Sequence, residues 1–337
     1  MRDDCSAAWL AAPRFVIPFD MNAPKISVII PTLNSVRFIG EAIDSALNQS
    51  VPVSEILVVD GGSRDGTVEA ARKIGGPVQV LSQEGRGRPG ARNTGLRRAT
   101  GDFIALLDSD DLWVPGKLAA QLDFFKKYSE IEMVFGDMAL FARADDANVP
   151  EILDAKVNDY LRRNPVNPAR MLECLFAVNF IPTSSVVFRK SCLQTVGFMN
   201  EQFLHCEDYE YWLRFAANSR TGFLDQVLVR RRMHDANAMN DAFIQNCEAT
   251  LAILNQWRKW SGLTGNASQT LLRRAVLVQY NLSSYLLKCG RPDEAYDQLR
   301  QIKDGDGKIP ILLHLKILAK TLLASRQGKS NRDSSRK

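Results

Sequence analysis

The sequence lacks the features that would place it among disulfide-rich, secreted or membrane-spanning proteins. Its six cysteines are scattered, and no two of them form a C-x-x-C pair. This usage is typical of reduced thiols and argues against a disulfide framework or a zinc site. No apolar run reaches the roughly 18 residues that a spanning helix needs. The first twenty residues make a poor signal peptide, because Arg2-Asp3-Asp4 opens them and Pro13-Arg14 interrupts their apolar patch. We therefore expect a cytoplasmic protein.

A basic face is also lacking, although the net charge is +5. From residue 316 onward there are seven Lys or Arg residues and one acid, so the rest of the chain is close to neutral. A basic tail is a weaker signal for nucleic acid than a basic face on a folded domain. The sequence therefore predicts no nucleic-acid partner, and we expect residues 326–337, rich in Ser, Arg and Lys, to be a disordered basic tail.

The segment 309–324 is mostly apolar, and basic residues follow it to the end of the chain. Two interpretations fit this pattern equally well. Residues 309–337 could make a peripheral contact with the inner face of the cytoplasmic membrane, where anionic lipids attract basic segments. The same apolar residues could instead form a core helix of a small C-terminal domain. Both alternatives stay open at this point.

Apolar strands and helical segments alternate along the first third of the chain, with short loops between them. This alternation predicts an α/β fold with a mostly parallel central sheet and helices on both faces. The expected strands are 25–31, 55–60, 78–81 and 102–108, and the expected helices are 34–49, 67–73 and 91–99. Further along we expect a helix over 117–128, a strand over 133–141, a loop or lid over 143–168, a strand over 180–189 and a helix over 207–217.

The pattern from residue 241 onward is helical throughout, and residues 275–302 read as one helical hairpin around Gly290-Arg291-Pro292. We therefore expect a small all-helical C-terminal region. Met21 leads directly into the first strand, so the residues before it read as a dispensable extension. The predicted organisation is an extension over 1–24, an α/β domain over 25–238, a helical domain over 239–325 and the tail over 326–337.

Two of the predicted strands end on aspartates, Asp60 and Asp108. Functional sites in parallel sheets lie beyond the carboxyl ends of the strands. Asp108 also begins the run Asp108-Ser109-Asp110-Asp111, whose three carboxylates repel one another unless a cation lies among them. A hard divalent ion, Mg²⁺ or Mn²⁺, prefers such oxygen ligands and in turn binds a diphosphate. The alternative is a solvated turn or a helix cap with extra acid.

A series of short motifs runs through residues 31–214 in one order. They are Pro31-Thr-Leu-Asn34, Asp60-Gly-Gly-Ser-Arg-Asp-Gly-Thr67, Gly90-Ala-Arg-Asn-Thr-Gly95, Asp108-Ser-Asp-Asp111 with Trp113, Pro115 and Lys117, Gly136-Asp137, Val196-Gly-Phe198 and Glu207-Asp-Tyr-Glu-Tyr-Trp-Leu-Arg214. Together they resemble the inverting glycosyltransferase family 2, whose fold is GT-A, the fold of the nucleotide-diphospho-sugar transferases. The sequence departs from that pattern at Leu33, where an aromatic residue is commoner, and at Gly62, where serine is.

The resemblance implies a role for each matching residue. The donor nucleotide sugar would be bound by Pro31, Thr32, Asn34, Asp60, Arg92 and Asp108. A divalent metal, Mn²⁺ or Mg²⁺, would be held by Asp110 and His234, and Asp208 would be the general base. Glu207 and Trp212 would lie on the acceptor side or position the base.

The resemblance also implies an activity. The protein would be an inverting glycosyltransferase that moves a hexose or related sugar from a UDP-, GDP- or dTDP-sugar to a hydroxyl group. The acceptor would be a saccharide or a lipid-linked saccharide, in the synthesis of a surface glycan.

Other interpretations of these residues stay open. Asp60 could be a helix cap, and Glu207-Asp208 could be plain acidic residues that the helix dipole favours in a first turn. His234 could be structural. Gly85-Arg-Gly-Arg-Pro-Gly90 matches a dinucleotide fingerprint but does not follow the first strand, so we interpret it as a flexible loop near the diphosphate. The alternative functions are a nucleotidyltransferase of related fold and a non-catalytic nucleotide-fold scaffold.

Overall fold

The computed structural model describes residues 24–141, 155–167, 169–233, 242–263, 265–300 and 302. His234, nearly all of the 1–24 extension and the whole of 309–337 lie outside the described residues. The chain divides into two compact units: Met1–Met171 with Phe180–Asn237, and Leu172–Asn179 with Ala238–Lys337. Among the described residues, no helix has the length and apolar character needed to cross a membrane.

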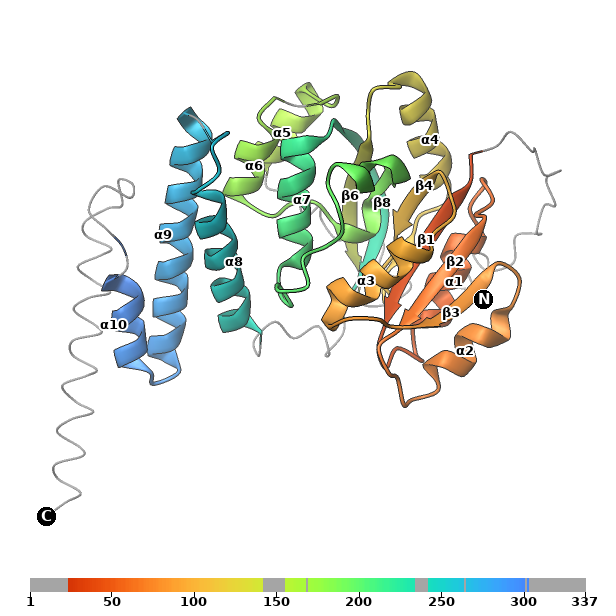
Figure 1. Ribbon diagram of the computed structural model, residues 1–337, viewed down its shortest axis with the longest axis horizontal. Coiled ribbons are helices and arrows are strands. Elements are labelled where there is room, and N and C mark those ends of the chain that lie inside the picture. Colours follow the sequence, from red (N-terminus) through yellow and green to blue (C-terminus); the bar gives the residue numbers. More distant parts are fainter. Residues whose placement is uncertain are drawn as a thin grey trace, which may run out of the picture. The chain divides into compact units, whose positions relative to one another are not determined.

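The first unit contains an eight-stranded sheet in the order β3-β2-β1-β4-β7-β6-β8-β5. Strands β1 to β4, β6 and β8 are labelled in Figure 1. Its first half is parallel throughout and consists of β1 (Ile26–Thr32), β2 (Glu55–Asp60), β3 (Val78–Ser82) and β4 (Phe103–Leu106). Its second half is mixed and consists of β5 (Leu112–Trp113), β6 (Met133–Phe141), β7 (Val187–Arg189) and β8 (Thr221–Arg232). Here β7 runs antiparallel to both β4 and β6, and β5 runs antiparallel to β8, while β6 and β8 are parallel.

Helices cover both faces of this sheet, as predicted. Side chains alternate between the faces along a strand, so Val28 and Ile30 of β1 point into one core. That core is closed by α1 (Ile39–Leu47), α2 (Thr67–Ile74) and α4 (Lys117–Lys127). Ile29 points to the opposite face and meets Gly95 of α3 (Gly87–Arg98). On the same face, Phe188 of β7 packs edge-on against aromatic rings of α7 (Glu207–Asn218).

The structure differs from several predicted elements. The first helix begins at Ile39 rather than Asn34, because Asn34 has a left-handed φ of 51° and is bonded to the loop after β2. Gly87 already begins α3, so the predicted loop over 85–90 is partly helical. Part of the predicted lid is the helix α5 (Ala155–Arg163). The predicted strand over 180–189 is reduced to β7, preceded by the single 3₁₀ turn η1 (Thr183–Ser185) and followed by η2 (Lys190–Gln194).

The strands β5 and β8 were not predicted. Only two residues form β5, and β8 has no regular alternation because buried residues come in runs, 221–223 and 228–229, on either side of an exposed stretch. The register between β6 and β8 also shifts on both sides of Asp137. A strand of this kind lacks the period-2 pattern by which strands are found in a sequence.

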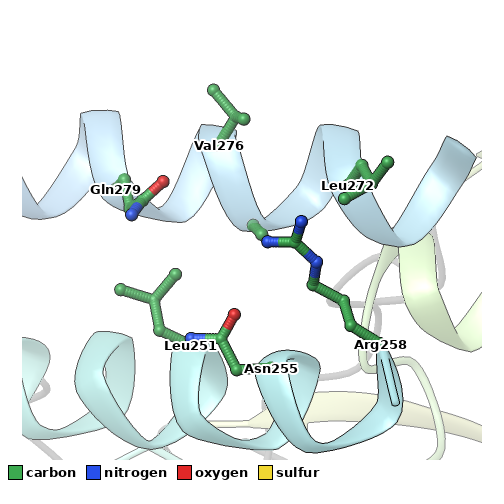
Figure 2. A pocket seen from close by; sticks show the side chains of 7 residues that line it. Leu251, Asn255, Arg258, Leu272, Val276 and Gln279 are labelled. Carbon is green, nitrogen blue, oxygen red and sulfur yellow. The ribbon is translucent and has the colours of Figure 1, made fainter. Parts of the chain in front are cut away.

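The second unit is helical, with α6 (Met171–Ala177) at its boundary with the first unit, and α8 (Phe243–Trp257), α9 (Gly265–Lys288) and α10 (Pro292–Arg300). The helices α9 and α10 form the predicted hairpin, and Leu282, Leu286 and Ala295 pack in its core with Cys247 of α8. Figure 2 shows a cavity of about 80 Å³ between α8 and α9, toward which Arg258 and Asn255 project. Its lining residues all belong to this unit and include no predicted site residue.

Candidate active site

The loops after β1 and β2 lie side by side, because Thr32 and Asp60 are partners in the parallel pairing of these strands. The Asp60 carboxylate accepts hydrogen bonds from the backbone N–H groups of Gly62 (3.0 Å) and Ser63 (3.1 Å). It therefore orders the turn after β2, and it does not cap α2, which begins only at Thr67. The hydroxyl of Thr32 is buried and has no hydrogen-bond partner among the described residues, so a polar donor atom is available at this strand end.

Asn34 fixes the distance between the same two loops. Its backbone N–H donates to the Ser63 hydroxyl (2.8 Å), and its side-chain oxygen accepts from the N–H of Arg64 (2.9 Å). These two hydrogen bonds hold Asn34 in its left-handed conformation, which asparagine tolerates better than most residues. The loops that the sequence assigned to the nucleotide are thus tied together by hydrogen bonds within the protein.

The acidic loop, Asp108–Asp111, follows β4 at the same edge of the sheet. Burial and the charges of Asp108 and Asp110 raise the pKa of Asp111 to about 8. The Asp111 carboxylate also accepts a short hydrogen bond from the hydroxyl of Ser184 (2.6 Å). Carboxylates that disfavour each other's ionisation in this way form a donor set that suits a hard divalent cation.

The acidic loop suits a metal ion whose remaining ligands come from a bound substrate and water. Among the described residues, no group of three or more His, Cys, Asp or Glu side chains is arranged to hold an ion without further ligands. Mg²⁺ typically takes only one or two protein carboxylates and completes its coordination with substrate phosphates and water. Asp110, which is half-buried beside Asp108, could supply such a carboxylate. The second predicted ligand, His234, lies outside the described residues.

Arg92 links two other predicted site residues, Asp108 and Glu207. Its guanidinium is buried and donates to Asp108 (2.8 Å) and to Glu207 (2.7 Å), which links the loop after β4 to the start of α7. Burial acts to raise the pKa of Asp108, but the charge of Arg92 and its hydrogen bond lower it below the usual value. For Glu207, burial has the larger effect and raises the pKa. The sequence assigned Arg92 to the donor, whereas here both of its terminal nitrogens are engaged by protein carboxylates.

Asp208 lies next to this ion pair, at the first turn of α7. Cys206 immediately precedes the helix with a left-handed φ of 56°, which turns the chain sharply before the two acids. Glu207 is directed inward to Arg92, while Asp208 remains half-buried. The two neighbouring acids therefore have different surroundings, and Asp208 is the more exposed of the two.

The structure places Trp212 away from solvent. Its side chain is fully buried and packs against the rings of Tyr211 and Phe215. Its position supports the helix that carries Asp208, so of its two predicted roles the positioning role fits, and a direct contact with the acceptor does not.

One arginine at this site, Arg231, was not among the predicted residues, whereas Arg88 belongs to the Gly85–Gly90 segment that the sequence placed near the diphosphate. In the pairing of β5 with β8, Leu112 is opposite Arg230, so Arg231 comes next to Asp111. The charges of Arg231 and of Arg88, in the first turn of α3, both act on Asp108. The run Arg230-Arg231-Arg232 was a visible signal, but its strand was not predicted and its place in the sheet was therefore unknown.

The sequence did not point to the turn η1 either. Ser184 lies between the acidic loop and α7, and nothing in its local sequence distinguishes it from an ordinary serine. Only the antiparallel pairing of β4 with β7 brings residues 183–185 to the end of β4. Such long-range pairing has no local sequence signature.

The parallel half-sheet, the hydrogen-bonded loops after β1 and β2 and the acidic loop at the carboxyl edge agree with a nucleotide-sugar transferase of the GT-A fold. The model of the family described as "Glycosyl transferase family 2" matches residues 27–195. The chain therefore belongs to glycosyltransferase family 2 and is a glycosyltransferase.

Its relatives are named accordingly. An uncharacterized glycosyltransferase of Rickettsia typhi is 29% identical over 266 residues, covering 76% of this chain and 75% of the relative. The Escherichia coli enzyme named UDP-Glc:alpha-D-GlcNAc-diphosphoundecaprenol beta-1,3-glucosyltransferase WfgD is 29% identical over 195 residues, covering 56% of this chain and 68% of the relative.

Solved structures share the fold at lower identity. Residues 1–349 of S. aureus TarS, in complex with UDP-GlcNAc, match with a TM-score of 0.65, 19% identity and 92% coverage of each chain. The mannosyltransferase PcManGT from Pyrobaculum calidifontis, in complex with GDP-Man and Mn²⁺, matches with a TM-score of 0.55 at 19% identity, covering 96% of this chain and 92% of the other.

Proposed function

We propose that this glycosyltransferase moves one sugar, with inversion, from a UDP-sugar to a hydroxyl group of a lipid-linked saccharide, with Asp208 as general base. The observation that carries the proposal is the link from the partly exposed Asp108 through the buried Arg92 to the buried Glu207. It fixes the loop that would hold the donor diphosphate next to the residue that would activate the acceptor.

The donor would bind along the carboxyl ends of β1, β2 and β4. The ordered loops at Asn34 and Asp60 offer backbone and carboxylate groups to the nucleoside, and the buried Thr32 hydroxyl lacks a partner that a ligand could supply. The guanidinium groups of Arg88 and Arg231 lie beside the acidic loop, where they suit a diphosphate better than a neutral ligand. Pro31, which is half-buried in β1, belongs to the wall of the same site.

A divalent ion, Mn²⁺ or Mg²⁺, would be held at Asp110 and would neutralise charge that develops on the leaving diphosphate. The carboxylate of Asp208 would accept the proton of the acceptor hydroxyl as that oxygen bonds to the anomeric carbon. At the same carbon the bond to the diphosphate oxygen breaks, and the nucleoside diphosphate leaves from the opposite face. A carboxylate on the acceptor side is what single displacement with inversion requires.

The proposed substrates rest on the relatives. The name of the Escherichia coli relative specifies a UDP-glucose donor and a diphosphoundecaprenol-linked acceptor, and TarS was solved with UDP-GlcNAc. PcManGT was solved with GDP-Man and Mn²⁺, so a GDP-sugar is the alternative donor. A lipid-linked acceptor agrees with a cytoplasmic enzyme at the inner face of the membrane, and contact through residues 309–337 remains a prediction.

We also propose the domain limits that the sequence indicated. They are 25–238 for the α/β domain, 239–325 for the helical domain and 326–337 for the tail.

A donor screen tests this function. Purified protein, Mn²⁺ and a diphosphoundecaprenol-linked sugar would be incubated with UDP-glucose, UDP-GlcNAc, GDP-mannose or dTDP-glucose, and the released nucleotide measured. We expect release of the nucleoside diphosphate from one UDP-sugar, dependent on both acceptor and metal. Release of pyrophosphate from a nucleoside triphosphate and a sugar phosphate would indicate a nucleotidyltransferase. Binding of nucleotides with no turnover of any donor would favour the scaffold.

A further inference from the structure

The 3₁₀ turn η1 (Thr183–Ser185) lies between the acidic loop and the helix that carries Asp208. It precedes β7, and β7 pairs with β4, whose carboxyl end leads into Asp108. The side chains of all three residues of the turn are buried. Hydroxyl groups buried at such a junction need hydrogen-bond partners, and those partners show what the turn does.

Ser184 and Ser185 anchor the turn to one side of the site. The Ser184 hydroxyl donates to Asp111 (2.6 Å) and accepts from the backbone N–H of Asp108 (3.0 Å). The backbone carbonyl of Ser184 accepts from the Trp113 indole (2.8 Å), and that of Ser185 accepts from the Gln121 amide (2.9 Å). These four bonds fix the turn to the acidic loop, to β5 and to α4.

The side chain of Thr183 is directed to α7 and not to the acidic loop. Its hydroxyl donates to Oδ2 of Asp208 at 3.3 Å, while Oδ1 of Asp208 accepts from the N–H of Tyr209 at 2.7 Å. Each carboxylate oxygen thus has one bond from the protein, and these two bonds set the plane of the carboxylate. The turn is anchored to the acidic loop. The Thr183 bond therefore sets the plane of the Asp208 carboxylate relative to the acidic loop, and not relative to α7 alone.

We propose that Thr183 is a positioning residue for the base: its hydroxyl orients the Asp208 carboxylate toward the acceptor hydroxyl. This inference rests on the proposed role of Asp208. Without this bond the carboxylate would rotate among orientations, of which only some reach the acceptor proton. A small error in the position of a reacting group is costly, because the entropic advantage of a fixed geometry is lost.

The test compares Thr183→Val, which has nearly the same shape but no hydroxyl, with Thr183→Ser, which keeps the hydroxyl. For Thr183→Val we expect kcat to fall on the order of 10-fold, with the KM for the donor within about twofold of the wild-type value. Thr183→Ser should recover most of the rate. The control is Thr195→Val, which removes an exposed threonine hydroxyl bonded only to a backbone carbonyl and should leave kcat unchanged.

A second comparison separates positioning from folding. In the Asp208→Asn background no base remains to be positioned, so adding Thr183→Val should change the residual rate by less than about twofold. An equal loss in both backgrounds, a raised donor KM with unchanged kcat, or failure of Thr183→Ser to restore the rate would overturn the proposal. If Asp208→Asn itself kept the wild-type rate, the proposed function would fail first, whatever the threonine variants did.

Discussion

The two halves of the sheet are built in different ways. The half proposed to bind the donor, β1 to β4 (the donor half), is a run of parallel strands joined by local crossover helices, and its polar loops follow the strands directly. The half proposed to face the acceptor, β5 to β8 with α7 (the acceptor half), is mixed, contains strands of two and three residues and pairs segments far apart in the chain. The donor half is thus specified locally, and the acceptor half by long-range contacts.

Besides the pairing of β4 with β7, side-chain bonds link the two halves. Arg92 joins Asp108 to Glu207, and Ser184 joins Asp111 to the turn before β7. From this turn, Thr183 reaches Asp208 within the acceptor half. If this comparison is right, substitutions within the donor half should affect nucleotide and metal binding, whereas those at the junction should affect stability or the chemical step.

The largest effect is expected at the proposed metal ligand in the donor half. Asp110→Ala should abolish the Mn²⁺-dependent rise in thermal stability that a nucleoside diphosphate gives, and turnover should fall on the order of 10³-fold because charge on the leaving group is no longer neutralised. Differential scanning fluorimetry with and without Mn²⁺ measures the first effect. The control is Asp102→Ala, before the opposite end of β4. Undiminished metal-dependent stabilisation in Asp110→Ala would remove Asp110 from the metal site.

The next largest effect is expected where the halves join. Arg92→Met keeps the length of the side chain but leaves Asp108 and Glu207 without their cation, which should lower the free energy of unfolding by about 3 kcal/mol. Chemical denaturation measures this loss. Arg98→Met on the same helix removes an exposed ion pair to Glu84 (3.3 Å) and should cost less than about 1 kcal/mol. Similar losses for the two variants would mean that the buried link does not hold the halves together.

A smaller effect is expected within the donor half itself. A Cβ at Gly95 would lie 2.5 Å from Cγ2 of Ile29, so Gly95→Ala should cost about 2 kcal/mol by forcing α3 away from β1. Gly40 of α1 has no atom within 4 Å of the same position, and Gly40→Ala should stabilise the protein by up to about 0.5 kcal/mol. Equal stability of the two alanine variants would show that the packing of α3 on β1 is looser than described.

The same difference explains what could be predicted from the sequence. Strands β1 to β4 were found because each is an apolar run of ordinary length, and Asp60 and Asp108 were found because they end such runs. Strand β8 was missed because its middle is exposed and its register shifts, and with it the place of Arg231 next to Asp111. Thr183 and Ser184 could not have been found, since their partners are 25 and 73 residues away in the chain.

Arg92 shows a different limit. The resemblance assigned this cation to the donor, but the order of motifs cannot show which anions it meets. In the structure its partners are Asp108 and Glu207, one on each side of the junction. Arg88 of the same helix is exposed, and we propose it, rather than Arg92, as the contact for the diphosphate.

The rate of the chemical step in Asp208→Asn tests the central claim most directly. The substitution preserves the size of the side chain and most of its hydrogen bonding, and it removes the proton acceptor. At saturating donor and acceptor we expect turnover to fall roughly 10²-fold or more, with donor affinity close to that of the wild type. Glu207→Gln should be milder, because the Glu207 carboxylate is already engaged by the guanidinium of Arg92. A wild-type rate in Asp208→Asn would contradict the account.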